Sequence, residues 1–138
     1  MEKYSLKEVH INLGDTLDDV STEFKGILTK ALTKIPAEVV DWTEKNIRFF
    51  SSLDSDDNPP CVAFFVNLKD WKHLKGFVFL CEVLKTKTEA EQAFWIAHEI
   101  AHAKLNQRNR VRCDPSQEKE IHGQEKEADK LAEEWLKS

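Results

Sequence analysis

The chain has 138 residues, of which 41% are hydrophobic and 33% charged, with a formal net charge of −5. This length fits one domain, and the apolar content is enough to bury a core without disulfide bonds. The acidic balance argues against a nucleic-acid-binding protein, and the apolar runs are far shorter than the roughly 20 residues of a membrane span.

The first 46 residues predict mainly helix. Residues 1–14 are ambiguous and allow a short strand over 9–13. A helix is predicted from position 15 or 16 to about 32, because apolar side chains recur there at helical spacing: Val20, Phe24, Ile27, Leu28 and Ala31. Pro36 fits the first turn of a second helix over 36–46.

Three short segments rich in β-branched and aromatic residues predict strands: 47–50, 61–68 and 76–84. The polar segment 51–60 between the first two predicts a turn-rich loop. It is acidic, but it lacks the glycine and the distal glutamate of an EF-hand loop, so calcium binding is not favoured. These segments indicate a small sheet of about three strands.

The C-terminal half predicts two more helices. Thr88 and Glu91 have the spacing of a capping box, which predicts a helix from 88 to about 106. A polar stretch follows, and a final helix is predicted over roughly 116–137. The order of elements indicates an α+β domain with a small antiparallel or mixed sheet.

The segment FWIAHEIAHAKLN, residues 94–106, places two histidines four apart with a glutamate directly after the first. Residues four apart on a helix share one face, so His98 and His102 can bind one ion. Zinc accepts imidazole nitrogen, and a catalytic zinc site combines three protein ligands with one water. Glu99 is then placed to take a proton from that zinc-bound water as general base.

The metal-free alternative is a buried helix whose histidines are satisfied by other groups. Apolar residues surround the motif on nearly all sides of the predicted helix: Phe94, Trp95, Ile96, Ala97, Ile100, Ala101, Ala103 and Leu105. Such a helix is buried, and burying two histidines and a glutamate without partners is costly. Metal coordination supplies partners and is the favoured interpretation. A site of two histidines and one glutamate also binds divalent ions other than zinc.

A third ligand is expected from the final helix, which is rich in acidic residues. Its apolar positions define an inward face: Ile121, Ala128, Leu131, Ala132, Trp135 and Leu136. At about 100° per residue, Glu125 lies about 50° from the centre of this face, whereas Glu127 lies more than about 100° away. Glu125 is therefore the predicted ligand, with His122 as its rival. Asp129 is predicted to accept the ring N–H of a ligand histidine.

The pair of segments HEIAH and EKEAD resembles the gluzincin metallopeptidases. In that family, HExxH on one helix is completed by a glutamate in an ExxxD or ExxAD segment on a later helix. On this resemblance, His98 and His102 match the zinc histidines, Glu99 matches the general base, Glu125 the third ligand and Asp129 the aspartate. The ExxAD form is similar to the catalytic domains of CAAX-prenyl-protease and heat-shock membrane peptidases. Size and layout are most similar to the soluble minigluzincins, and ImmA/IrrE-type peptidases share the pattern.

The match covers residues 98–129. It implies a zincin-like fold over 1–138, in which a small twisted sheet packs on the HExxH helix and on a C-terminal ligand helix. It also implies that 76–84 is the upper edge strand, where an extended peptide substrate would pair by strand addition. Glu82 in this strand is interpreted first as solvent-facing and second as a substrate contact. The N-terminal segment 1–35 matches no part of the family.

Gluzincins often use a histidine, tyrosine or arginine to stabilise the oxyanion of the transition state. His122 has the best predicted placement for this role, and other candidates exist: Tyr4, His73, Arg108, Arg110 and Arg112. Without such a group, the alternative to an active enzyme is a catalytically latent zinc-binding module with a regulatory or interaction role.

The sequence thus predicts a zinc-dependent metallopeptidase acting on a peptide or protein substrate. The three cysteines form no CxxC pair, which indicates neither a disulfide framework nor a cysteine zinc site and fits a reducing compartment. The N-terminus has no apolar signal core. We therefore expect a cytoplasmic protein without nucleic-acid or membrane partners. The sequence indicates no oligomeric state.

Overall fold

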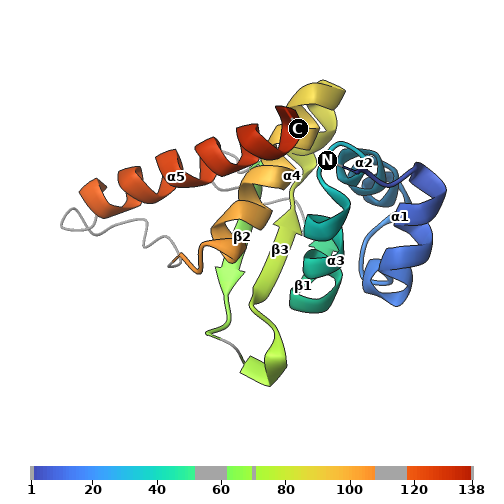
Figure 1. Ribbon diagram of the computed structural model, residues 1–138, viewed down its shortest axis with the longest axis horizontal. Helices are drawn as coiled ribbons and strands as arrows, with labels where there is room; N and C mark the ends of the chain where they lie inside the picture. The colour runs from blue at the N-terminus through green and yellow to red at the C-terminus, as the bar shows by residue number, and fades with distance from the viewer. Residues whose placement is uncertain (1, 52–61, 70, 108–117, 138) are drawn as a thin grey trace.

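The N-terminal third consists of three helices, seen in a computed structural model that describes residues 2–51, 62–69, 71–107 and 118–137 (Figure 1). They are α1 (Leu6–Leu13), α2 (Thr22–Leu32) and α3 (Ala37–Asn46), with a 3-10 turn, Gly14–Leu17, after α1. The predicted helix over 36–46 is confirmed, with Pro36 as the residue before its first turn.

Two N-terminal predictions are wrong. The suggested strand over 9–13 is part of α1, because Ser5 and Glu8 form a capping box that starts a helix just upstream. The predicted helix from 15 or 16 to 32 is interrupted. Its second part, α2, begins after Ser21, whose hydroxyl accepts a hydrogen bond from the Phe24 backbone N–H at 3.4 Å.

The sheet contains β1 (Ile47–Ser51), β2 (Ala63–Asn67) and β3 (Gly76–Leu80), in the order β1-β3-β2. Strand β3 pairs parallel with β1 and antiparallel with β2. The prediction that 76–84 is an edge strand is therefore wrong, because β3 is hydrogen-bonded on both sides and cannot accept a substrate strand. The last part of that segment is a 3-10 helix, Glu82–Thr86, in which Glu82 pairs with Lys85 at 2.9 Å.

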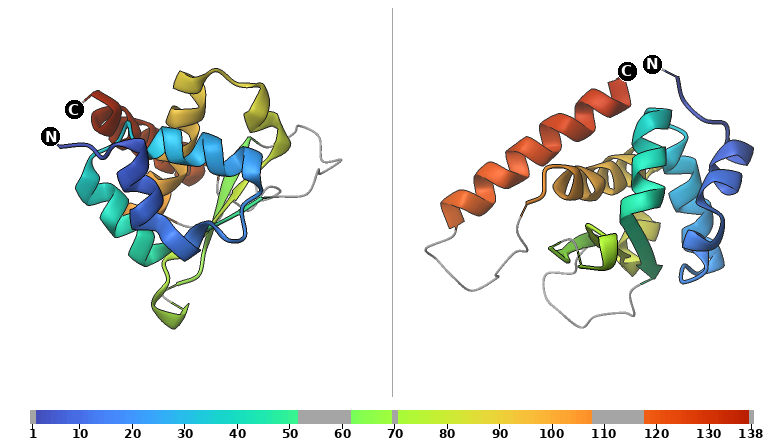
Figure 2. Two further views of the ribbon diagram at one scale, coloured as in Figure 1. Left: turned by 90° about the vertical axis from the view of Figure 1, so that its right-hand side faces the viewer. Right: turned by 60° about the horizontal axis from the view of Figure 1, so that its bottom comes forward.

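Two long helices complete the fold: α4 (Glu89–Lys104) and α5 (Glu118–Lys137). The predicted capping box of Thr88 and Glu91 is present at the start of α4. Helix α4 packs against the sheet and against α2, and α5 crosses it on another side, so that α4 lies between α2 and α5 (Figure 2). The described segments contain no helix with the length and apolar character needed to cross a membrane.

The architecture is thus α+β, with five α-helices and a three-stranded mixed sheet among the described residues. One core joins the N-terminal helices, the sheet, α4 and α5. Its largest side chains with almost no exposed area include Phe24, Leu28, Phe49, Leu80, Ile96 and Ile100. This core fixes α4 in place, and α4 carries the HExxH motif.

Candidate metal centre

Three side chains that can hold a metal ion lie together on α4. His98, Glu99 and His102 expose only 1%, 6% and 9% of their surface. One donor atom from each lies within 4.8 Å of the others. The cap at Thr88 begins the helix, and the four-residue spacing then directs both imidazoles to the same side.

Helix α5 brings a second carboxylate to the imidazole pair. Glu125 Oε2 lies 2.8 Å from His98 Nε2, and Glu125 Oε1 lies 3.4 Å from His102 Nε2. The two Nε2 atoms are 3.0 Å apart. Ala128, one turn after Glu125, has no exposed surface, and its small side chain permits close approach of the two helices. The predicted juxtaposition of Glu125 with both histidines is present.

The donor atoms belong to chemical types that a zinc ion accepts, and they lie slightly closer together than the donors of a bound zinc ion. Atoms bound at 2.0–2.1 Å to a tetrahedral zinc ion lie about 3.3–3.4 Å from one another. Of the observed separations, 3.4 Å equals this spacing, whereas 2.8 and 3.0 Å are shorter. Two imidazole nitrogens and one carboxylate are also a donor set that zinc accepts.

The Nδ1 atoms of His98 and His102 face different side chains. Asp129 Oδ1 lies 2.8 Å from His98 Nδ1, although its direction does not satisfy a hydrogen bond and Nδ1 is otherwise unpaired. The distance places the Asp129 carboxylate beside that nitrogen, and the role of Asp129 as acceptor of the ring N–H stays a prediction. His102 Nδ1 lies 2.6 Å from Gln107 Oε1. The rings of Phe94 and Trp95 flank His98, with centroids 6.0 and 5.6 Å from it.

Gln107 and Glu127 join the site without having been predicted. Gln107 is 6% exposed, and its Nε2 donates to Glu127 Oε2 at 3.3 Å. Gln107 follows the end of α4 at a turn where Asn106 has a φ of 53°. Helix phase cannot place a residue beyond the helix end, so the sequence carries no comparable signal for Gln107. Glu127 is on the exposed side of α5, as its phase predicts, and its side chain still reaches Gln107.

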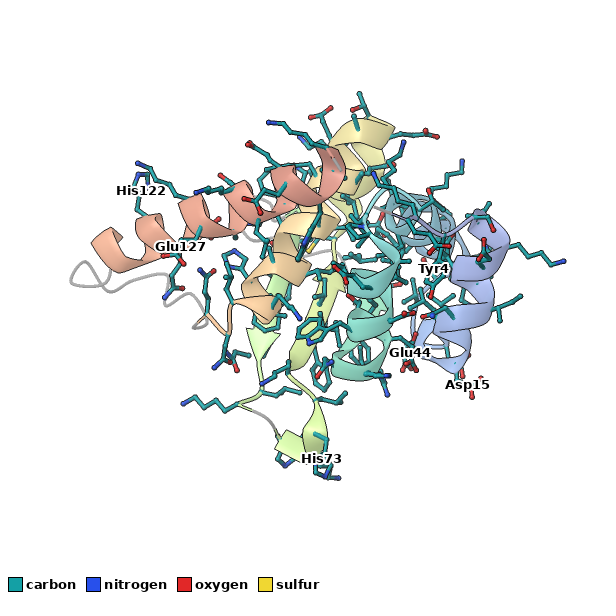
Figure 3. The ribbon with its side chains drawn as sticks, in the orientation of Figure 1. Tyr4, Asp15, Glu44, His73, His122 and Glu127 are labelled. Atoms are coloured by element: carbon teal, nitrogen blue, oxygen red, sulfur yellow. The ribbon has the colours of Figure 1, made fainter. Side chains whose placement is uncertain are left out.

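The structure does not bring His122 to the site. His122 is exposed, and it projects from the side of α5 opposite Glu127 (Figure 3). Its phase explains this, because it lies about 120° around the helix from buried Ala128. His122 therefore neither competes with Glu125 for the imidazole pair nor lies where an oxyanion would form.

The other predicted transition-state groups do not join the cluster within the described segments. The Tyr4 hydroxyl donates to Asp41 Oδ1 at 2.7 Å on the N-terminal helices, and this hydrogen bond raises the pKa of Tyr4 above 10.0. His73 is exposed on the connection between β2 and β3. The three arginines at 108, 110 and 112 lie outside the described residues.

A scan against protein-family models and searches of curated proteins and solved structures found no match to the chain. The resemblance to gluzincins is thus carried by the motif segments HEIAH and EKEAD and by the general layout of the chain.

Proposed function

We propose that the chain is a zinc-dependent metallopeptidase of the gluzincin type. The observation that carries this proposal is the convergence of three donor side chains from two helices on one buried point. His98 Nε2, His102 Nε2 and the Glu125 carboxylate lie 2.8 to 3.4 Å from one another. Buried polar groups at this density are costly unless they are paired or bind a metal.

His98, His102 and Glu125 would hold the zinc ion in this proposal. A zinc ion bound there supplies Lewis-acid chemistry, because it lowers the pKa of a coordinated water and polarises a carbonyl oxygen. Asp129 would keep the His98 ring oriented by accepting its Nδ1–H, which leaves Nε2 for the metal.

Glu99 is the general base of the proposed reaction. Its carboxylate would take the proton of the attacking water and later deliver a proton to the leaving amine. Its position next to His98 and its 6% exposure keep it beside the metal ligands in a site largely closed to bulk water. A glutamate at this position is used in the same way in HExxH peptidases, which the chain resembles.

The experiment that tests the proposal combines metal analysis with the Glu99→Gln variant. Protein purified without chelators should contain about one zinc per chain, and Glu99→Gln should retain it. Cleavage of a mixed peptide library should fall by about 10²- to 10⁴-fold in Glu99→Gln, because general-base catalysis is lost. Glu134→Gln, an exposed change on α5, is the control and should cleave like the unmodified chain.

A zinc-free protein, even after addition of zinc and dialysis, would exclude the proposed metal centre. Equal cleavage by Glu99→Gln and the unmodified chain would exclude Glu99 as the base.

A second candidate is a catalytically latent zinc module with a regulatory or interaction role. The observation that favours it is that no predicted oxyanion-stabilising side chain among the described residues reaches the site, since His122 points away and Tyr4 bonds to Asp41. This candidate predicts one zinc per chain without turnover. A peptidase assay before and after limited proteolysis distinguishes it from the active enzyme.

A further inference from the structure

Gln107 is held in place through both its backbone groups. Its backbone N–H donates to the His102 carbonyl at 3.0 Å, and its carbonyl accepts from Asn67 Nδ2 at 2.7 Å. The first bond folds the chain back over the last turn of α4, and the second joins it to the end of β2. Because the backbone is fixed in this way, a directed contact of the side chain costs side-chain entropy but no further backbone entropy.

The side chain of Gln107 bridges His102 and Glu127. Glu127 is a carboxylate, so it can only accept hydrogen bonds, and the Gln107 amide must turn its NH₂ group toward it. The amide oxygen then faces His102 Nδ1, at 2.6 Å. An amide oxygen also only accepts, so Nδ1 must carry the hydrogen.

We infer that Gln107, oriented by Glu127, fixes His102 as the tautomer with hydrogen on Nδ1 and a free electron pair on Nε2. Gln107 is therefore a positioning residue that prepares His102 for a metal ion. This inference rests on the proposed function only because it takes zinc as the ion that His102 Nε2 binds. Residues that hydrogen-bond to a ligand histidine in this way typically raise metal affinity by about 10- to 100-fold.

The hydrogen positions around the two imidazoles explain why a cation fits beside this tautomer. With Nδ1 of His102 protonated, its Nε2 is an acceptor. His98 Nε2 lies 3.0 Å from this acceptor and 2.8 Å from Glu125 Oε2, so it has to carry hydrogen when no cation is present. A neutral His98 would then face Asp129 Oδ1 with a bare Nδ1 at 2.8 Å, an acceptor against an acceptor. A cation bound to both Nε2 atoms removes this conflict, because both Nδ1 atoms can then carry hydrogen, one facing Gln107 Oε1 and the other facing the Asp129 carboxylate.

The two ligand histidines would thus be oriented by unlike partners. His98 faces a charged carboxylate, whereas His102 faces a neutral amide whose direction is set by a second carboxylate further out. Glu127 acts on His102 only through Gln107. The glutamine and the glutamate therefore form one unit, and exchanging the two residue types should preserve its function.

The test uses Gln107→Met, which keeps the length of the side chain and removes the acceptor. The matched control is Gln92→Met, the same change at a half-buried glutamine of α4 that bonds to the Leu84 carbonyl at 3.0 Å. Zinc affinity is measured by competition with a chromophoric chelator, and the His102 tautomer by ¹⁵N NMR of the ring nitrogens. The exchange variant Gln107→Glu with Glu127→Gln is measured beside them.

We expect Gln107→Met to weaken zinc binding by about 10- to 100-fold and Gln92→Met to leave it within about twofold. The unmodified chain should show hydrogen on His102 Nδ1 with and without zinc, and metal-free Gln107→Met should lose this preference. The exchange variant should recover most of the affinity, because its carboxylate accepts from both His102 and the new amide.

Unchanged affinity and tautomer in Gln107→Met would overturn the inference. So would an exchange variant that folds and binds zinc as weakly as Gln107→Met, because the loss would then come from packing. If Gln107→Met does not fold, the tautomer of the unmodified chain and the affinity of the exchange variant decide the question. A chain that binds no zinc but keeps the His102 Nδ1–H tautomer would contradict the proposed function and leave the orienting role of Gln107 standing.

Discussion

Helix α4 packs against α2 and against α5, and the two contacts differ in chemistry. On the α2 side, four of the five buried residues of α2 are apolar: Phe24, Leu28, Ala31 and Leu32. On the α5 side, buried apolar residues such as Ala128 and Ala132 lie beside a polar cluster, in which the imidazoles of His98 and His102 face a carboxylate from Glu125. One helix therefore takes part in an apolar contact and in a mixed one that contains a polar cluster.

The difference indicates a division of roles. Burial of apolar area stabilises the fold in proportion to that area. A buried polar cluster contributes little net stability and demands complete pairing. The contact with α2 can therefore hold α4 rigidly enough for His98 and His102 to be presented on the α5 side. The stability of the α5 contact should then depend on whether these histidines and Glu125 bind a metal ion. Three changes test this division.

The largest effect is expected from Leu28→Ala on the apolar side. Leu28 has no exposed surface, so this truncation leaves a cavity and should lower the free energy of unfolding by about 2–5 kcal/mol. Leu6→Ala, on exposed α1 surface, is the control and should change it by less than about 0.5 kcal/mol. Denaturant unfolding of the metal-free proteins measures both. A Leu28→Ala protein that remains folded should still bind one zinc per chain, and loss of the zinc would contradict the division.

The next effect is expected from Glu125→Ala on the polar side, and it should appear only when zinc is present. A ligand that binds the folded chain alone stabilises it by about 2.7 kcal/mol at a free concentration of 100 times its Kd. The unmodified chain and Glu134→Ala should show this gain in thermal unfolding, and Glu125→Ala should show little of it at the same zinc concentration. An equal gain in all three proteins would mean that Glu125 is not a ligand.

Much of the α4 site could be predicted because it depends on residues that lie close together in the sequence. The capping box of Thr88 and Glu91 fixes where the helix begins, and helical spacing then sets the relation between His98 and His102. Helix phase also singled out Glu125 and Asp129, two α5 carboxylates that each lie 2.8 Å from a ring nitrogen of His98, although their roles stay predictions. These inferences need only the geometry of one helix and the position of its apolar face.

The parts that failed depend on contacts between distant segments. Strand β3 lies in the centre of the sheet because β1 and β2 pair with its two edges, and no pattern within 76–84 encodes its neighbours. Gln107 takes its place from a turn after α4 and from bonds to Asn67 and Glu127. His122 was assigned to the site from its closeness in sequence to Glu125, but a difference of about 60° in helix phase places it outside.

The smallest effect is expected from Glu91→Gln, at the start of the helix that both contacts share. The Glu91 carboxylate accepts from the Thr88 backbone N–H at 3.3 Å and from the Thr88 hydroxyl at 3.0 Å, and these bonds hold its pKa below the ordinary value of 4.5. A lowered folded-state pKa gives stability that is complete above about pH 4.5 and is lost as the pH falls through the lower value. Glutamine keeps an acceptor for Thr88 but has no charge to lose.

The unmodified chain should therefore have the higher Tm near pH 7, by about a degree or two, and the two Tm values should converge as the pH falls toward about 3. Glu89→Gln, in the same first turn but without a hydrogen bond to Thr88 among the described contacts, separates the cap from the effect of charge on the helix dipole. Because the cap acts on the whole helix and not on either contact, zinc affinity should be the same in all three proteins. A change in zinc affinity in Glu91→Gln alone would mean that the start of α4 is coupled to the polar contact with α5, and the two sides of the helix could not then be treated as independent.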